Sequence, residues 1–175
     1  MHYRRNRIRI GGPGVTVQID ETLLTRRKYN RGRVVRSHQW LFGGIEVGSG
    51  RAFLKLVRRR DAQTLERIIC RHILPGTTIA SDSWRAYNNL TRLLMLYSHL
   101  IVNHRINFVN PTTGAHTQNI ESCWQKLKMM SKIRYGINNK RYVDYLYEFL
   151  WRREFRDQEG LFFKFRDTVA IFYPC

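Results

Sequence analysis

Hydrophobic and polar positions alternate in the first part of the chain with the two-residue period of β-strands. The alternation from Val15 to Ile19 predicts a half-buried strand over 15–22, and apolar runs predict two more strands over 39–47 and 51–57. A Gly-Ser-Gly segment joins the last two runs, so a tight hairpin is expected between them. The three strands are therefore expected to be consecutive members of one sheet.

Two adjacent glycines, Gly43 and Gly44, lie inside the second predicted strand. Glycine has no side chain to pack, and inside a strand it marks a bulge or a place where another group approaches the backbone closely. The sequence leaves both alternatives open.

A helical period replaces the alternation after the third predicted strand. Asp61 is a favourable N-cap for a helix predicted over 61–73. A short strand is predicted over 77–81, followed by a short helix over 83–90 and a fifth strand over 100–103.

Two longer helical segments follow. Residues 116–128 carry a continuous apolar stripe, and Glu121 lies on its shoulder. A helix that packs on a sheet would present a carboxylate at this position to the strand ends. Residues 141–156 are predicted to form a last helix with aromatic residues around most of its circumference, and no element is predicted for 157–175.

The composition is that of one basic, globular domain. The 175 residues include 43% hydrophobic side chains, which is enough for a core, and no apolar run approaches the roughly 20 residues that cross a bilayer. Lys and Arg exceed Asp and Glu by 31 to 13, which gives a formal net charge of +18. Nucleic acid is therefore the leading partner class, and no membrane partner is expected, because no basic amphipathic helix stands out.

Three acids stand at places where a fold could bring them together. Asp20 follows the alternating part of the first strand, Asp82 follows the fourth strand, and Glu121 lies on the later helix. Two-metal cleavage of a phosphodiester needs such a carboxylate cluster, because Mg²⁺ and Mn²⁺ prefer oxygen ligands. The simpler alternative for Asp20 and its neighbour Glu21 is that they cap a turn.

These features occur together with short motifs that resemble the Merlin superfamily of DDE transposases, a group that includes bacterial insertion-sequence transposases. The resemblance runs in order over roughly residues 15–135, so it is more specific than any single motif. The matching segments are Val17–Thr22, Arg27–Arg33, Trp40–Gly44, Arg60-Asp61 with Thr64-Leu65, Pro75-Gly76, Ser81–Tyr87, Val102–His104, and His116–Glu121 with Trp124 and Lys128.

The resemblance implies an α/β, ribonuclease-H-like fold, with a mixed central sheet of about five strands flanked by helices. It implies that Asp20, Asp82 and Glu121 are the catalytic residues and hold two Mg²⁺ or Mn²⁺ ions. Some bacterial relatives carry Asn in the third position, so Asn119 is kept as a second candidate beside Glu121. The positions expected to contact the DNA backbone are Arg26, Arg27, Lys28, Arg31, Arg33 and Lys128.

The expected organisation has three parts. Residues 1–14 form a basic N-terminal stub, 15–135 form the catalytic core, and 136–175 form a C-terminal helix and tail packed on the core. Relatives carry an N-terminal DNA-binding region, whereas 14 residues precede the first predicted strand here. The chain is therefore expected to be a fragment or a domain-only remnant.

The resemblance implies DNA transposition, that is, metal-dependent hydrolysis of DNA at transposon ends followed by strand transfer into target DNA. The alternative is a domesticated, non-catalytic DNA-binding protein derived from a transposase, and a basic RNA-binding protein is a third hypothesis. The expected partner is double-stranded DNA, with a homodimer or higher oligomer on DNA left open. The expected location is the nucleus, or alternatively the bacterial cytoplasm.

Overall fold

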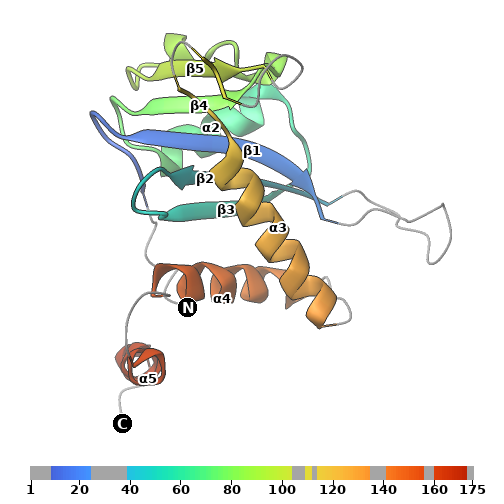
Figure 1. The fold of residues 1–175 in the computed structure, drawn as a ribbon, viewed down its shortest axis with the longest axis vertical. Helices are drawn as coiled ribbons and strands as arrows, with labels where there is room; N and C mark the ends of the chain where they lie inside the picture. Colours follow the sequence, from blue (N-terminus) through green and yellow to red (C-terminus); the bar gives the residue numbers. More distant parts are fainter. Residues whose placement is uncertain are drawn as a thin grey trace, which may run out of the picture.

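A computed structural model describes residues 9–24, 39–103, 109–111, 114–134, 141–155 and 160–172, and the structural statements below concern these residues. Five strands form one sheet with helices packed on both faces (Figure 1). The elements in chain order are β1 (Thr16–Leu23), β2 (Trp40–Glu46), β3 (Ala52–Val57), α2 (Ala62–His72), β4 (Thr78–Asp82), the 3₁₀ turns η1 (Arg85–Tyr87) and η2 (Leu90–Arg92), β5 (Ser98–Val102), α3 (Gln118–Ile133), α4 (Tyr142–Glu154) and α5 (Leu161–Phe172).

The strands are ordered β3-β2-β1-β4-β5 in the sheet, so β1 is central. β1, β2 and β3 are antiparallel neighbours, whereas β4 and β5 run parallel to β1. The predicted mixed sheet of about five strands is confirmed. Because β1 and β4 are parallel neighbours, their carboxyl ends lie at the same edge of the sheet.

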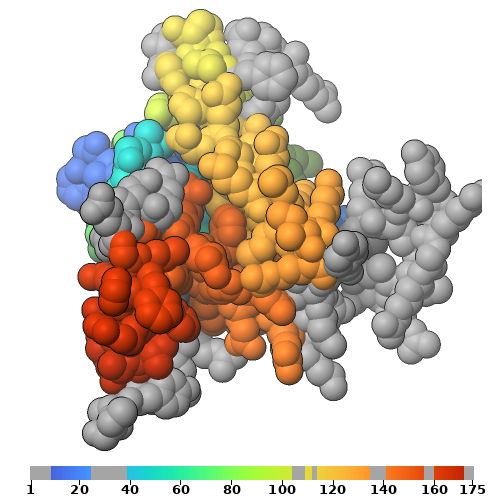
Figure 2. Space-filling view, turned by 60° about the horizontal axis from the view of Figure 1, so that its bottom comes forward, coloured from blue at the N-terminus to red at the C-terminus, as the bar shows by residue number. Residues whose placement is uncertain are grey.

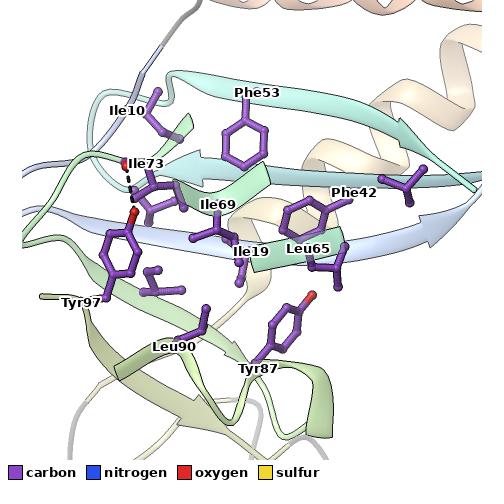
Figure 3. Packing of buried hydrophobic residues seen from close by; sticks show 13 residues of the cluster. Ile10, Ile19, Phe42, Phe53, Leu65, Ile69, Ile73, Tyr87, Leu90 and Tyr97 are labelled. Atoms are coloured by element: carbon purple, nitrogen blue, oxygen red, sulfur yellow. Dashed lines mark hydrogen bonds between the residues drawn. The ribbon is translucent and has the colours of Figure 1, made fainter. Parts of the chain in front are cut away.

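One face of the sheet is covered by α2 and the two 3₁₀ turns. Val17 and Ile19 of β1 point to this face and pack in a fully buried cluster with Leu65 and Ile69 of α2 (Figure 3). The hydroxyl of Tyr97 closes the cluster by donating a hydrogen bond of 2.9 Å to the Ile73 carbonyl. Val17 and Ile19 enter this core, and the residues that alternate with them point to the opposite face, which explains the alternation that predicted β1.

The opposite face is covered by α3 and α4. Leu41 and Ile45 of β2 pack there against Leu127 of α3 and Leu146 of α4, all of them buried. Figure 1 shows α3 in front of the sheet, where it crosses β1. Residues of β1 at even positions, including Asp20, point to this α3 face.

Gly43 and Gly44 mark close approaches and not a bulge. The pairing between β1 and β2 runs without interruption from Val17 opposite Glu46 to Leu23 opposite Trp40. A Cβ atom at Gly43 would lie 2.7 Å from Cη2 of Trp124 and 2.9 Å from the Phe53 carbonyl oxygen. Glycine at this position therefore makes room for the indole of α3.

The start of α2 agrees with the prediction, because the Asp61 carboxylate accepts a hydrogen bond of 3.0 Å from the Thr64 amide. The helix predicted over 83–90 is replaced by two 3₁₀ turns. The Asp82 side chain accepts the Trp84 amide at 3.1 Å, and such a local bond competes with a regular helix.

Residues 9–14 join the core through the backbone. Ile10 is fully buried, and its amide donates to the His72 carbonyl while its carbonyl accepts from the Leu74 amide, both at 2.9 Å. The short segment is thereby attached to the end of α2.

α5 is a helix that the sequence pattern did not predict. Most of its apolar side chains are exposed, and its Phe165 ring contacts Trp151 of α4 with centroids 5.8 Å apart. Figure 2 shows α5 in red beside α4, with α3 in lighter orange above them. None of the helices in the described part of the chain combines the length and apolarity that a membrane crossing needs.

The packing around Gly43 predicts that Gly43→Ala destabilises the domain by about 1–3 kcal/mol, because the added methyl group meets the Trp124 ring and a backbone carbonyl. Urea denaturation measures this directly. The exposed substitution Gln63→Ala is the control and is expected to change the free energy of unfolding by less than about 0.5 kcal/mol. An unchanged unfolding free energy for Gly43→Ala would contradict the described packing.

Candidate active site

Asp20 and Asp82 lie side by side on neighbouring strands. In the parallel pairing of β1 with β4, Gln18 lies opposite Ala80, and the two aspartates follow two residues later on each strand. Both therefore point to the α3 face, on strands about 4.8 Å apart. The charge of Asp82 accordingly raises the pKa of Asp20.

Glu121 reaches the same region from the first turn of α3. Its Oε1 accepts a hydrogen bond of 2.9 Å from the Thr117 hydroxyl, which directs the carboxylate. The charge of Glu121 also raises the pKa of Asp20. The structure thus brings the three predicted site acids together, although a hundred positions separate the first from the last.

Gln18 attaches α3 to the central strand. Its side chain is 1% exposed, and its Oε1 accepts the backbone amides of Asn119 at 2.9 Å and Ile120 at 3.2 Å. Its Nε2 lies 3.2 Å from Nδ1 of His116. The first amides of a helix have no partner within the helix, so Gln18 acts as a cap supplied by another element.

The role of Gln18 was missed in the sequence. It occupies a polar position in the alternation of β1, which predicts exposure to solvent. Its proximity to Asp20, two residues farther along the same face, is the signal that could have identified it. Gln18 places the start of α3, and with it Glu121, beside the aspartates.

Trp124 holds Asp20 from one turn farther along α3. Its Nε1 donates a hydrogen bond of 2.9 Å to Oδ2 of Asp20, and its ring is buried over Gly43. The tryptophan packs between helix and sheet, as an aromatic residue on the apolar stripe of α3 is expected to do, and it makes this hydrogen bond in addition. Because Trp124 is only 4% exposed, its ring is not available to stack on an unpaired base.

The pKa of Asp20 is raised to about 6. Burial is the main cause, the amide of Glu21 and the indole of Trp124 act in the opposite direction, and the charges of Asp82 and Glu121 add to the increase. A carboxyl group that resists ionisation among other carboxylates is typical of a functional site, because a bound cation would relieve the repulsion.

Glu21 lies on the opposite face of the sheet, towards Tyr87. Burial raises its pKa to about 7, the Tyr87 hydroxyl lowers it, and the charges of Asp20 and Asp82 raise it further. The interpretation that Asp20 and Glu21 cap a turn is wrong, because β1 continues through both to Leu23. The two neighbouring acids therefore point to opposite faces of the sheet.

The donor chemistry of the site suits a hard divalent cation. Asp20, Asp82 and Glu121 supply carboxylate oxygens, and each accepts a hydrogen bond from the protein on one oxygen. Within the described ranges, however, no three His, Cys, Asp or Glu side chains are already gathered at the distances of a metal site. The residues present fit the ion in the type of donor and in their position at one edge of the sheet.

The other predicted site residues are only partly described. Lys128 is exposed on α3, seven residues after Glu121 and hence on the same side of the helix. Asn119 contributes its amide to Gln18, and its side chain is half-buried. The loop residues Arg26, Arg27, Lys28, Arg31 and Arg33 lie outside the described residues, so their DNA contacts stay predictions.

Residues 11–154 match the family model of the ISXO2-like transposase domain. The chain belongs to this family of DDE transposases. The family match extends from the segment before β1 to the end of α4, so it includes all three acids. A comparison with curated proteins gives no match.

Retroviral integrases are similar to the transposase domain in fold. One similar chain belongs to the simian T-cell lymphotropic virus intasome, solved in complex with PP2A regulatory subunit B56 gamma. It has a TM-score of 0.52 and 16% identity. That match covers 84% of this chain and 50% of the other, so the domain spans half of that protein's length.

Two integrase catalytic core domains are also similar. The HTLV-2 core, solved in complex with magnesium in a dimeric form, has a TM-score of 0.51 and 14% identity over 80% of this chain and 86% of its own. The BIV core has a TM-score of 0.52 and 14% identity over 90% of this chain and 97% of its own. These catalytic cores are ribonuclease-H-like, so the predicted fold class is confirmed.

The raised pKa values of Asp20 and Glu21 predict that the metal-free transposase domain loses stability as the pH rises. A carboxyl group with a raised pKa contributes stability below its ordinary pKa, and this contribution is lost as the pH rises through the pKa of the folded state. The loss is expected between about pH 4 and 6 for Asp20 and between about pH 4.5 and 7 for Glu21. Asp20→Asn and Glu21→Gln are therefore expected to raise the melting temperature relative to wild type more at pH 8 than at pH 4.5. Melting in EDTA across this range measures the effect. Asp167→Asn, on exposed α5, is the control, and a pH-independent difference for the site variants would contradict the prediction.

Proposed function

We propose that this transposase domain is a Merlin-type enzyme that cleaves DNA phosphodiesters at transposon ends and joins the resulting 3′-hydroxyl to target DNA. The observation that carries the proposal is the convergence of Asp20, Asp82 and Glu121 at one edge of a ribonuclease-H-like sheet. The order of motifs along the chain supports the Merlin type. A nuclear location, or a bacterial cytoplasmic one, stays a prediction.

Asp20 and Asp82 from the strands and Glu121 from the helix would hold two Mg²⁺ or Mn²⁺ ions. When bound, such ions activate the attacking hydroxyl and stabilise the negative charge that develops on the phosphate oxygens. The magnesium complex of the HTLV-2 core supports this choice of ion by analogy of fold.

The protein's own donors fix how the carboxylates are presented. Trp124 restrains Asp20, the Trp84 amide restrains Asp82, and the Thr117 hydroxyl restrains Glu121. Each carboxylate thereby accepts at least one hydrogen bond from the protein, which limits its rotation. This preorganisation lowers the entropy that would otherwise be lost when substrate binds.

The domain would bind double-stranded DNA through its excess of positive charge. Lys128, on the same side of α3 as Glu121, would contact the phosphate backbone next to the carboxylates. The five basic residues of the 26–33 segment would add further backbone contacts. The dimeric form of the HTLV-2 core supports a homodimer on DNA.

The proposal predicts that Asp82→Asn lowers the rate of Mg²⁺-dependent nicking of duplex DNA by at least about 10²-fold, because a metal ligand is lost. DNA affinity measured in EDTA should change by less than about threefold, since the phosphate contacts come from other residues. Time courses of plasmid nicking with and without EDTA measure the rate.

Asp61→Asn is the matched control, because Asn also caps a helix and Asp61 lies at the start of α2. It should nick at the wild-type rate. Wild-type protein that binds duplex DNA without metal-dependent nicking would support the non-catalytic, transposase-derived binder instead. Nicking that survives in Asp82→Asn would place the catalytic site elsewhere.

A further inference from the structure

A hollow of about 260 Å³ lies at the turn between β2 and β3, where α4 ends against it. Three arginines from distant parts of the chain line it, namely Arg9 before β1, Arg51 at the start of β3 and Arg153 in the last turn of α4. Glu154 is the one carboxylate among the described residues that line it.

This hollow is separate from the carboxylate edge. Val17 of β1 pairs with Glu46 at the end of β2 that leads into the turn, whereas Asp20 pairs with Gly43. Three residues of strand correspond to about 10 Å, and the turn lies farther in the same direction. The hollow also lies on the β3 side of β1, while Asp82 lies on the β4 side.

Two of the three arginines are held in place by bonds that leave their charge in effect. Nε of Arg153 donates to the Gly50 carbonyl at 2.8 Å, and Nη2 of Arg9 donates to the Cys70 carbonyl at 3.3 Å. Carbonyl groups are neutral, so neither bond cancels a guanidinium charge. Arg51 is paired differently, because its Nη2 lies 2.9 Å from Oε2 of Glu46, and its side chain is still 49% exposed.

A purely structural role explains part of this arrangement. The bond from Arg153 to Gly50 attaches the end of α4 to the hairpin, and one arginine is sufficient for that purpose. It does not explain why two more guanidinium groups from other segments line the same hollow. The Ser49 hydroxyl donates to Oε1 of Glu46 at 2.6 Å, so the donors that face the hollow are guanidinium groups, which bind phosphate.

We infer that this hollow binds one phosphodiester group of duplex DNA, as a second backbone contact apart from the carboxylate edge. The volume is below the roughly 300–1,000 Å³ of pockets that enclose whole small molecules, so it suits a phosphate and part of its sugar. The net charge of +18 favours a polyanion over free phosphate. This site rests on the proposed binding of duplex DNA and adds a backbone contact apart from Lys128 and the 26–33 segment.

The test is DNA affinity in EDTA as a function of salt concentration, with the double variant Arg9→Gln/Arg153→Gln. Gln removes the charge, and its amide nitrogen corresponds in position to Nε of arginine, so Arg153→Gln can still donate to the Gly50 carbonyl. The weaker bond that Arg9 makes through Nη2 to the Cys70 carbonyl is lost with the charge. The double variant should bind duplex DNA at least fivefold more weakly at 100 mM salt, and the slope of log K against log[salt] should decrease by about one, the value for one lost phosphate contact. Exposed Arg67 and Arg92 provide the control, Arg67→Gln/Arg92→Gln, which should change the slope by less than half as much.

Equal affinity and slope for the two double variants would overturn the inference. Titration with inorganic phosphate distinguishes the ligand sources, because saturable phosphate binding that Arg9→Gln/Arg153→Gln abolishes while DNA affinity is unchanged would make this a free-phosphate site and would also overturn it. If the double variant does not fold, the exposed single variant Arg9→Gln should still weaken DNA binding about twofold. Binding in EDTA requires no cleavage, so this result is independent of the nicking test of the proposed function.

Discussion

The side chain of Gln18 joins the central strand to the first turn of α3, and the geometry of the site depends on this junction. The Thr117 hydroxyl does not cap the helix, because it donates to Glu121 instead. Gln18 therefore accepts the two amides that would otherwise lack a partner, which a capping side chain does at a gain of about 0.5–2 kcal/mol. One residue of β1 thus fixes the helix that carries Glu121, and Asp20 follows on the same face.

A second constraint follows from burying Asp20 under α3. The burial that brings the helix close also makes ionisation of Asp20 unfavourable, as its raised pKa indicates. Trp124 offsets part of this cost by donating to the carboxylate, and Gly43 allows the indole to approach closely enough to do so. The close packing of β1, α3 and Gly43 therefore surrounds one buried carboxylate, that of Asp20. A bound cation would remove the remaining repulsion from Asp82 and Glu121.

Much of the fold could be predicted because hydrophobic periodicity reports which side of an element is buried. This worked for β1, β2, β3 and α2, and for the placement of the three acids on neighbouring elements. It failed for Gln18, since a buried polar residue with internal partners has the same pattern as an exposed one. It failed for α5, whose apolar residues surround the helix without facing a core.

Glu21 shows a further limit of the pattern. Its neighbour Asp20 faces α3, whereas Glu21 faces Tyr87, and only the continuation of β1 to Leu23 separates the two acids onto opposite faces. The sequence alone does not distinguish a strand that ends at an acid from one that passes through it. The resemblance to transposases identified Asp20 as a site residue, and the pairing of β1 with β4 explains its position physically.

The most direct test of the central claim is Mn²⁺ affinity, measured by titration for the wild-type domain, Gln18→Leu and Gln18→Glu. The account predicts that Gln18→Leu, which removes the acceptor for the α3 amides, weakens Mn²⁺ binding at least about tenfold, and that Gln18→Glu, which keeps an acceptor oxygen, retains most of the affinity. A folded Gln18→Leu protein that binds Mn²⁺ as tightly as the wild type would contradict the account, because Glu121 would then reach the aspartates without this junction.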